Sequence, residues 1–166
     1  LVGSEMCIRD RFKGISESLR RPVSPGTLSL LMDPEHPLFK NFPTDAQTNW
    51  QWWSVIKSSR PLILDLAPSD LNPIVQVVDN MERNHKLGLI FEMGIGKGKL
   101  LVCMADPEAL RKTPEGRQLY SSLVSYVQSR DFNPKMICSP EEFKALFSGN
   151  TLSPNIKNVD NVTDYK

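Results

Sequence analysis

The sequence predicts a layered α/β fold with a mixed sheet and a late antiparallel hairpin. In the first half of the chain, short apolar runs bounded by Gly, Pro and Asp alternate with segments that have helical spacing. Two further apolar runs then flank a glycine-rich stretch with no helical segment between them. Because alternating helices and strands form layers, and strands in direct succession pair antiparallel, the sheet should be mixed.

The start of the chain does not resemble a folded element. Its first eleven residues, LVGSEMCIRDR, show neither a helical nor a strand period, and they resemble translated adapter sequence at the end of an assembled reading frame. We therefore treat residues 1–11 as an artefactual extension, and expect the natural sequence to begin near Phe12 as a fragment. The rest divides into an α/β domain over residues 12–134, a C-terminal helix within 135–148 and a loose polar tail over 149–166.

The early elements follow from apolar spacing. Phe12, Ile15 and Leu19 predict a helix that ends before Pro22. A second helix should begin at Thr48, with a Thr or Asn cap. Apolar runs between turn residues predict three strands, at Thr27–Met32, Pro61–Leu66 and Pro73–Asp79.

The later helices have clearer patterns. We expect a loop from Asp106 to Glu115, followed by an amphipathic helix with one apolar stripe formed by Leu119, Leu123, Val124 and Val127. The last helix, Ser139–Phe147, opens with a Ser cap, a Pro and then Glu142 three residues after the cap. That spacing is a capping box.

The stretch FEMGIGKGKLLVC, Phe91–Cys103, raises the question of a phosphate-binding loop. Such a loop needs a helix directly after its glycines, so that the helix N-terminus can face the anion. Here an apolar run with strand character follows instead, and neither glycine-rich nucleotide motif is matched. We therefore predict a hairpin whose turn lies within Gly94–Gly98, with at least one glycine at positive φ.

Composition argues against several functional classes. The 166 residues carry a net charge of +1 without a basic stripe, which gives no support for nucleic-acid binding. Cys7, Cys103 and Cys138 lack metal-ligand or disulfide-framework spacing, and we predict neither a metal nor a cofactor. No run approaches the ~20 apolar residues of a membrane span.

Several stretches together resemble the C-terminal region of bacterial (Bacteroidetes-type) glycoside hydrolase family 2 proteins, which are β-galactosidase-like or sugar-binding-domain proteins. They are RPVSPGTLSLLMDPEHPLFKNFPTD, NWQWWSVIKSSRPLILD, PIVQVVDNMERNHKLGLIFEMGIGKGKLLVCMAD and EGRQLYSSLVSYVQSRDFNP. The resemblance covers roughly Phe12 to Pro134 and is specific only in combination. It implies an incomplete class I amidotransferase-like, flavodoxin-like accessory domain that packs on the catalytic barrel of a periplasmic or secreted parent.

The residues themselves give no catalytic site. A family 2 barrel takes about 250 residues, which is more than this chain provides. Glu92, Asp79 and Asp106 lie in or at the ends of predicted strands, where acids most often serve turns and caps rather than the paired carboxylates of a glycosidase. An amidotransferase-like enzyme domain is an alternative, but Cys103 lies within a strand, and His36 and His85 fall in polar connectors.

The tryptophans are the remaining candidates for a site. Trp50, Trp52 and Trp53 fall within four residues, and on a helix Trp50 and Trp53 share one face. We expect Trp50 and Trp53 to be buried on the sheet or under Phe39–Phe42, with Trp52 pointing elsewhere. The predicted role is structural packing against the parent, and the alternative is a carbohydrate-binding module that uses these three residues.

Overall fold

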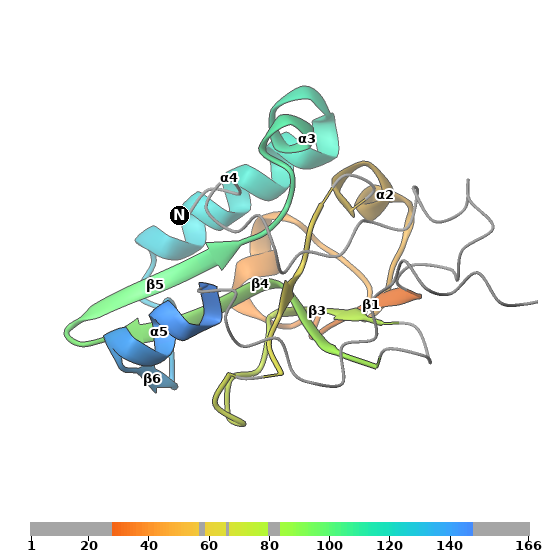
Figure 1. Cartoon of the computed structure of the whole chain (residues 1–166). Coiled ribbons are helices and arrows are strands. Elements are labelled where there is room, and N and C mark those ends of the chain that lie inside the picture. The colour runs from red at the N-terminus through yellow and green to blue at the C-terminus, as the bar shows by residue number, and fades with distance from the viewer. Residues whose placement is uncertain (1–27, 57–58, 66, 80–83, 148–166) are drawn as a thin grey trace, which may run out of the picture.

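The computed structural model describes residues 28–56, 59–65, 67–79 and 84–147 (Figure 1). The predictions for the extension 1–11, for the helix at 12–20 and for the tail 149–166 therefore lie outside the described residues. The elements are β1 (Ser29–Met32), η2 (Pro37–Asn41), α2 (Trp50–Ile56), β2 (Leu62–Ile63), β3 (Val75–Val78), β4 (Lys86–Ile95), β5 (Gly98–Cys103), α3 (Pro107–Lys112), α4 (Pro114–Gln128), β6 (Ile137–Cys138) and α5 (Pro140–Phe147).

The ten-residue strand β4 organises the sheet. The first half of β4 pairs with β3 on one side and with β2 on the other side. Strand β3 in turn pairs with β1. The second half of β4 pairs antiparallel with β5 and parallel with β6. Ile90 has partners on both sides, Val75 of β3 and Cys103 of β5, so β5 continues the edge begun by β2. The sheet is mixed, as predicted.

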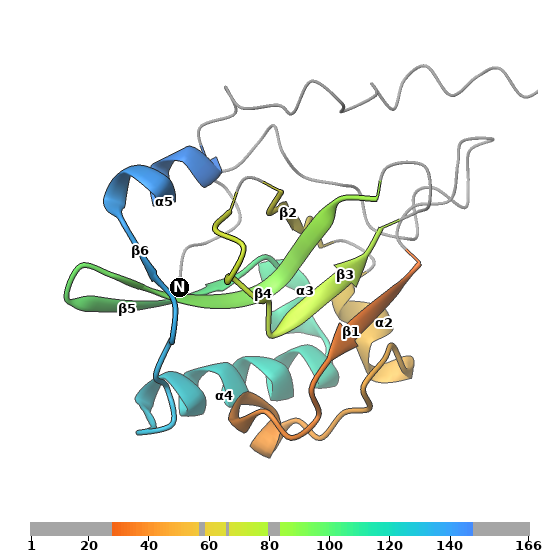
Figure 2. The same ribbon diagram turned by 90° about the horizontal axis from the view of Figure 1, so that it is seen from below.

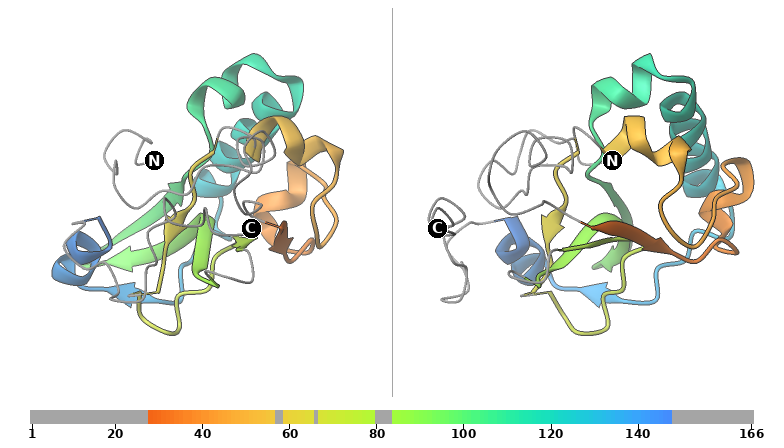
Figure 3. Two further views of the ribbon diagram at one scale, coloured as in Figure 1. Left: turned by 45° about the vertical axis from the view of Figure 1, so that its right-hand side comes forward. Right: turned by 90° about the vertical axis from the view of Figure 1, so that its right-hand side faces the viewer.

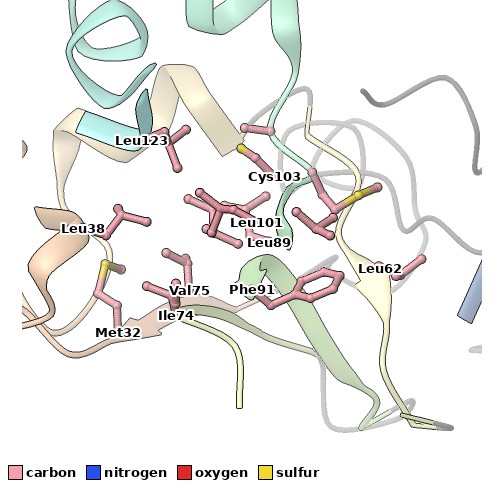
Figure 4. Close-up of a cluster of buried hydrophobic side chains, with 14 of the residues drawn as sticks. Met32, Leu38, Leu62, Ile74, Val75, Leu89, Phe91, Leu101, Cys103 and Leu123 are labelled. Atoms are coloured by element: carbon pink, nitrogen blue, oxygen red, sulfur yellow. The ribbon is translucent and has the colours of Figure 1, made fainter. Parts of the chain in front are cut away.

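A register shift between β3 and β4 concentrates apolar side chains at the centre of the sheet. Val75 lies opposite Ile90, whereas Gln76 lies opposite Gly88, so Leu89 is an extra residue on β4. Such a bulge increases the local twist. Val75, Leu89 and Ile90 are all fully buried, and Figure 4 shows Val75 and Leu89 among the core side chains.

Helices cover both faces of the sheet, which confirms the predicted α/β class. Helix α4 lies on one side of β4 and β5 and α5 on the other, while η2 and α2 flank α4 (Figures 2 and 3). Leu119 and Leu123 of α4 are fully buried, and Leu146 of α5 is also part of the core. Within the predicted apolar stripe of α4, Val127 is an exception, because it is 38% exposed.

The hairpin prediction is confirmed. Strands β4 and β5 pair antiparallel up to Ile95 and Gly98, so only Gly96 and Lys97 form the turn. Gly96 has φ +58°, and Lys97 does not share a positive φ. A positive φ at only the first central residue is typical of a type II′ hairpin turn, a conformation that glycine adopts without steric cost.

The capping box of α5 is also confirmed. Ser139 Oγ accepts from the Glu142 N–H at 3.1 Å, and Glu142 Oε2 accepts from the Ser139 N–H at 2.8 Å. Of the two predicted caps of α2, Thr48 is wrong, because Thr48 Oγ1 accepts from the Leu30 N–H of β1 at 2.7 Å. The alternative, Asn49, directly precedes the first residue of α2, Trp50, and its backbone carbonyl accepts from the Trp52 N–H at 3.1 Å. The predicted loop after Asp106 is also wrong in part, since α3 forms there with the Asp106 carboxylate accepting from the Glu108 N–H at 2.9 Å.

Candidate functional site

Helix α2 is anchored by one of its three tryptophans. Trp52 is fully buried, and its ring meets Phe39 and Phe42 edge to face at centroid distances of 6.3 and 5.2 Å. Its Nε1–H donates to Thr44 Oγ1 at 2.8 Å. The buried indole therefore has both its apolar surface and its one polar group satisfied, which favours a single orientation of α2.

The other two tryptophans are exposed, so the prediction for them is wrong. Trp50 is 88% exposed and Trp53 is 39% exposed, whereas Trp52 is the buried one. The cause is the phase of the helix: Val55 and Ile56 face the core, and Trp52 lies three and four residues before them on the same face. Trp50 and Trp53 share a face as expected, but that face points to solvent.

The exposed pair forms an aromatic surface of considerable size. If a tryptophan side chain presents up to about 250 Å², these exposures leave about 300 Å² of aromatic surface in water. This is comparable to the largest apolar patch on a typical monomer, and such patches commonly mark binding sites. We call Trp50 and Trp53 together the aromatic face of α2.

Polar groups lie next to the aromatic face. The side-chain amide of Asn49 donates to Asp45 Oδ2 at 3.1 Å, and the amide of Gln51 donates to the Pro43 carbonyl at 2.8 Å. Asn49 Oδ1 and Ser54 Oγ are buried without a hydrogen-bond partner in the described part of the chain. Exposed rings beside amide and carboxylate groups can contact either a protein surface or a sugar.

The three acids considered from the sequence each hold local structure. Glu92 Oε2 accepts from the hydroxyl of Tyr126 at 2.8 Å, which ties β4 to α4. Asp79 Oδ2 accepts from the His85 N–H at 3.1 Å, and Asp106 caps α3. These contacts are those of turn, cap and packing residues.

Asp79 and Glu92 are also too far apart to form a glycosidase pair. Asp79 follows Val78, which lies opposite Lys86 at the start of β4, while Glu92 lies six residues further along that strand. At about 3.3 Å per residue, the two positions are separated by roughly 20 Å. Retaining enzymes hold their carboxyls about 5–5.5 Å apart and inverting ones about 6.5–9.5 Å apart.

Cys103 and His85 do not form a nucleophile–base pair. Burial raises the pKa of the Cys103 thiol to about 11, which leaves it protonated and unreactive near neutral pH. Cys103 lies opposite Ile90, whereas His85 directly precedes β4, so the two residues lie about 15 Å apart along the strand. The pKa of Cys138 is also raised, first by burial and then by Glu142.

The sequence did not predict the pairing of His85 with Asp65. His85 Nδ1 is paired with the Asp65 carboxylate, whose other oxygen accepts from the Lys86 N–H at 2.7 Å. Asn84, just before His85, has φ +51°, a conformation that Asn tolerates better than most residues. Asp65 thus fixes the entry of β4, and no spacing in the sequence could have connected it to a residue twenty positions away.

Another group of polar side chains, formed by His36, Glu92 and Tyr126, joins η2, β4 and α4. His36 Nδ1 accepts from the Leu38 N–H at 3.2 Å, and its ring meets that of Tyr126 edge to face at 5.4 Å. Burial lowers the pKa of His36, against the opposing effects of Glu92 and Asp33. Burial also raises the pKa of Tyr126, and its hydrogen bond to Glu92 raises it further. Neutral His36 is the form that can accept this hydrogen bond.

Two further findings bear on ligands and membranes. In the ranges that the structure describes, no three His, Cys, Asp or Glu side chains are grouped so that they could hold a metal ion. None of the helices in those ranges combines the length and apolarity needed to cross a membrane.

Comparison with known proteins places the chain in a family. No curated protein matches this sequence. One family model, described as a domain of unknown function (DUF8487), matches residues 12–148. This match begins at Phe12 and includes α5, so the chain belongs to the DUF8487 family over most of its length.

Proposed function

We propose that this chain is a non-catalytic accessory domain of a glycoside hydrolase family 2-like, β-galactosidase-like enzyme. In this proposal it packs against the catalytic barrel of the same polypeptide through the aromatic face of α2. The observation that carries the packing role is the exposure of Trp50 and Trp53 on a helix that Trp52 holds in place. The link to a periplasmic or secreted glycosidase is supported by the sequence resemblance alone.

The finer fold assignment is also part of the proposal. A class I amidotransferase-like, flavodoxin-like domain has a parallel sheet, and the described part contributes one parallel pair, β4 with β6. A structure of the full parent, in which further parallel strands join this sheet, is the observation that would support the assignment.

The energetics favour an interface at the aromatic face. Covering about 300 Å² of apolar surface contributes about 7 kcal/mol before the entropic costs of association are subtracted. Tryptophan is enriched among the residues that dominate binding energy. A domain that is tethered to its partner in one polypeptide faces a smaller entropic cost of association, so this area can be enough.

The non-catalytic role can be tested directly. The purified chain should not hydrolyse chromogenic β-galactosides, β-glucuronides or β-mannosides, because Glu92, Asp79 and Asp106 are engaged separately. Turnover that is lost in Glu92→Gln, Asp79→Asn or Asp106→Asn would overturn the proposal. In the full parent, Trp50→Ala should lower the midpoint of thermal unfolding while the isolated chain stays unaffected.

A carbohydrate-binding module is the second candidate, and the exposed rings of Trp50 and Trp53 favour it. Sugars stack on exposed aromatic faces, and the exposed Asp45 carboxylate, which accepts from the Asn49 amide beside Trp50, offers an acceptor for sugar hydroxyl groups. Titration of the chain with galacto-, gluco- and manno-oligosaccharides, followed by tryptophan fluorescence, separates the two candidates. Saturable binding that is lost in Trp50→Ala would establish the module, whereas the accessory-domain proposal expects no binding.

A further inference from the structure

A continuous row of aromatic rings runs through the domain and passes through one histidine. Successive rings meet edge to face in the order Phe132, Tyr126, His36, Phe39, Trp52 and Phe42. The centroids of neighbouring rings lie 5.2 to 6.3 Å apart, which is the range of favourable aromatic pairs. All of these rings are buried except that of His36, which is partly exposed. Protons from solvent can therefore act on the row at His36.

His36 also fixes the first turn of η2. Its Nδ1 accepts from the Leu38 N–H at 3.2 Å, and its backbone carbonyl accepts from the Phe39 N–H at 2.9 Å. The ring of Phe39, which lies on that turn, meets the ring of Trp52 at 6.3 Å. The state of His36 therefore bears on a residue that packs directly against the anchor of α2.

Only the neutral ring of His36 can make the contact to Leu38. A neutral imidazole has one nitrogen that accepts a hydrogen bond, whereas the protonated ring has two donors and no acceptor. Protonation therefore sets a ring N–H of His36 against the Leu38 N–H, and the helix terminus loses its side-chain cap. A cap of this kind is a recognised contribution to the stability of a helix end.

The charged groups that face His36 offer the protonated ring different partners. Burial lowers the pKa of His36 below its ordinary value of 6.5, while Glu92 from β4 and Asp33 from the turn before η2 oppose this shift. From α4, Tyr126 packs on the ring and donates its hydroxyl proton to Glu92. Because both carboxylates attract a protonated imidazole, the ring exchanges the Leu38 N–H for an attraction to Glu92 and Asp33 when it gains a proton.

We propose that His36 is a pH-sensitive link between η2 and the aromatic face of α2. At neutral pH the neutral ring holds the first turn of η2, and with it Phe39 against Trp52. At mildly acidic pH the protonated ring leaves the Leu38 N–H, and the contact between Phe39 and Trp52 loosens. Phe42 and Thr44 still hold Trp52, so α2 opens more often without the sheet or α4 unfolding.

The inference deepens the proposed function, because it adds regulation to the same aromatic face. Its consequence for the parent, weaker packing against the catalytic barrel at acidic pH, rests on the proposed function. The change within the chain does not, since it concerns only His36, Phe39 and Trp52. The experiment therefore uses this chain alone, without a barrel or a glycoside.

The test is hydrogen exchange at the indole N–H of Trp52, measured by NMR on the full chain from about pH 7.5 to about pH 5, a range that spans the ordinary pKa of histidine. This N–H is buried and donates to Thr44 Oγ1, whereas the 88% exposed Trp50 gives the reference for an unprotected indole. After correction for the intrinsic exchange rate at each pH, protection of the Trp52 N–H should fall at least about threefold, as expected for the loss of one cap. The midpoint of this fall should coincide with the titration of the His36 ring in the same sample.

Two replacements of His36 form a matched pair. His36→Asn keeps an acceptor that does not titrate in this range, so protection of the Trp52 N–H should stay high at every pH. His36→Ala has no acceptor, so protection should already be low at neutral pH and should not fall further. Exchange of the α4 amides at the buried Leu119 and Leu123 reports whether the rest of the fold persists. If His36→Ala does not fold, the comparison of wild type with His36→Asn still decides.

Three results would overturn the inference. Protection of the Trp52 N–H could stay constant while His36 titrates. It could fall equally in wild type and in His36→Asn, which would place the titrating group elsewhere. Protection at Leu119 and Leu123 could fall together with that of Trp52, which would indicate unfolding of the whole domain instead of a local link. None of these results affects the glycoside assays or the effect of Trp50→Ala in the parent, so failure here is distinguishable from failure of the proposed function.

Discussion

Replacement of Trp52 by Ala should destabilise the fold far more than replacement of Trp50, although both residues lie on α2. Trp52 is fully buried against Phe39 and Phe42 and donates to Thr44 Oγ1. Large-to-small changes of a buried aromatic cost about 3–5 kcal/mol, and loss of the hydrogen bond to Thr44, whose hydroxyl keeps its contacts to Met32 and Asp45, adds up to about 1 kcal/mol. Trp50 is 88% exposed, so Trp50→Ala should stay within about 0.5 kcal/mol of wild type.

Urea unfolding followed by circular dichroism at 222 nm is the appropriate assay, because tryptophan fluorescence itself changes in these variants. A stability of about 5–15 kcal/mol means that Trp52→Ala could leave little folded protein, so Trp52→Phe serves as a milder variant with an expected loss of about 2 kcal/mol. Equal losses for Trp50→Ala and Trp52→Ala, at unchanged m-values, would refute the assignment of Trp52 as the anchor of α2.

Two further predictions concern the turn and the histidine cap. Gly96→Ala should lower the free energy of unfolding in urea by about 1 kcal/mol, because φ is +58° at Gly96. The control Gly98→Ala introduces no steric conflict and should lower it less. Equal losses in the two variants would contradict the II′ turn. Because the folded-state pKa of His36 lies below its ordinary value of 6.5, neutral His36 stabilises the fold above pH 6.5, and this contribution is lost as the pH falls below that value. His36→Asn keeps a side chain that can accept the capping hydrogen bond. The urea midpoint of unfolding of this variant should therefore fall less than that of wild type between pH 7.5 and 5.5. Parallel pH profiles of the two proteins would argue against this role of His36.

Features set by local chemistry could be predicted from the sequence. The β4–β5 hairpin follows from a glycine that allows a positive φ between two apolar runs. The capping box at Ser139 follows from residue types three positions apart. In both cases the deciding contacts lie within a few residues, so a single stretch of sequence contains the whole cause.

Features without an apolar period, or with partners distant in the sequence, could not be predicted in the same way. Helix α3 was missed because none of its residues is buried and it has no apolar period, although Asp106 and Pro107 provide a local cap signal. The bulge at Leu89 and the pairing of His85 with Asp65 depend on partners from other strands and loops. The prediction for the tryptophans was wrong for a related reason. Helical spacing places Trp50 and Trp53 on one face of the helix and Trp52 on another, but it does not say which of these faces packs on the sheet.

The separation of the three tryptophans into two roles strengthens the case for a partner at α2. Among the contacts of the described residues, Trp52 supplies the aromatic contacts and the side-chain hydrogen bond that fix the helix, so the ring of Trp50, which is 88% exposed, is not needed to hold it. Exposed tryptophan carries a cost in solubility that a polar side chain at the same positions would avoid. A domain that places two such rings on one face of an anchored helix therefore has a surface suited to being covered, and in the function proposed above the catalytic barrel provides that cover.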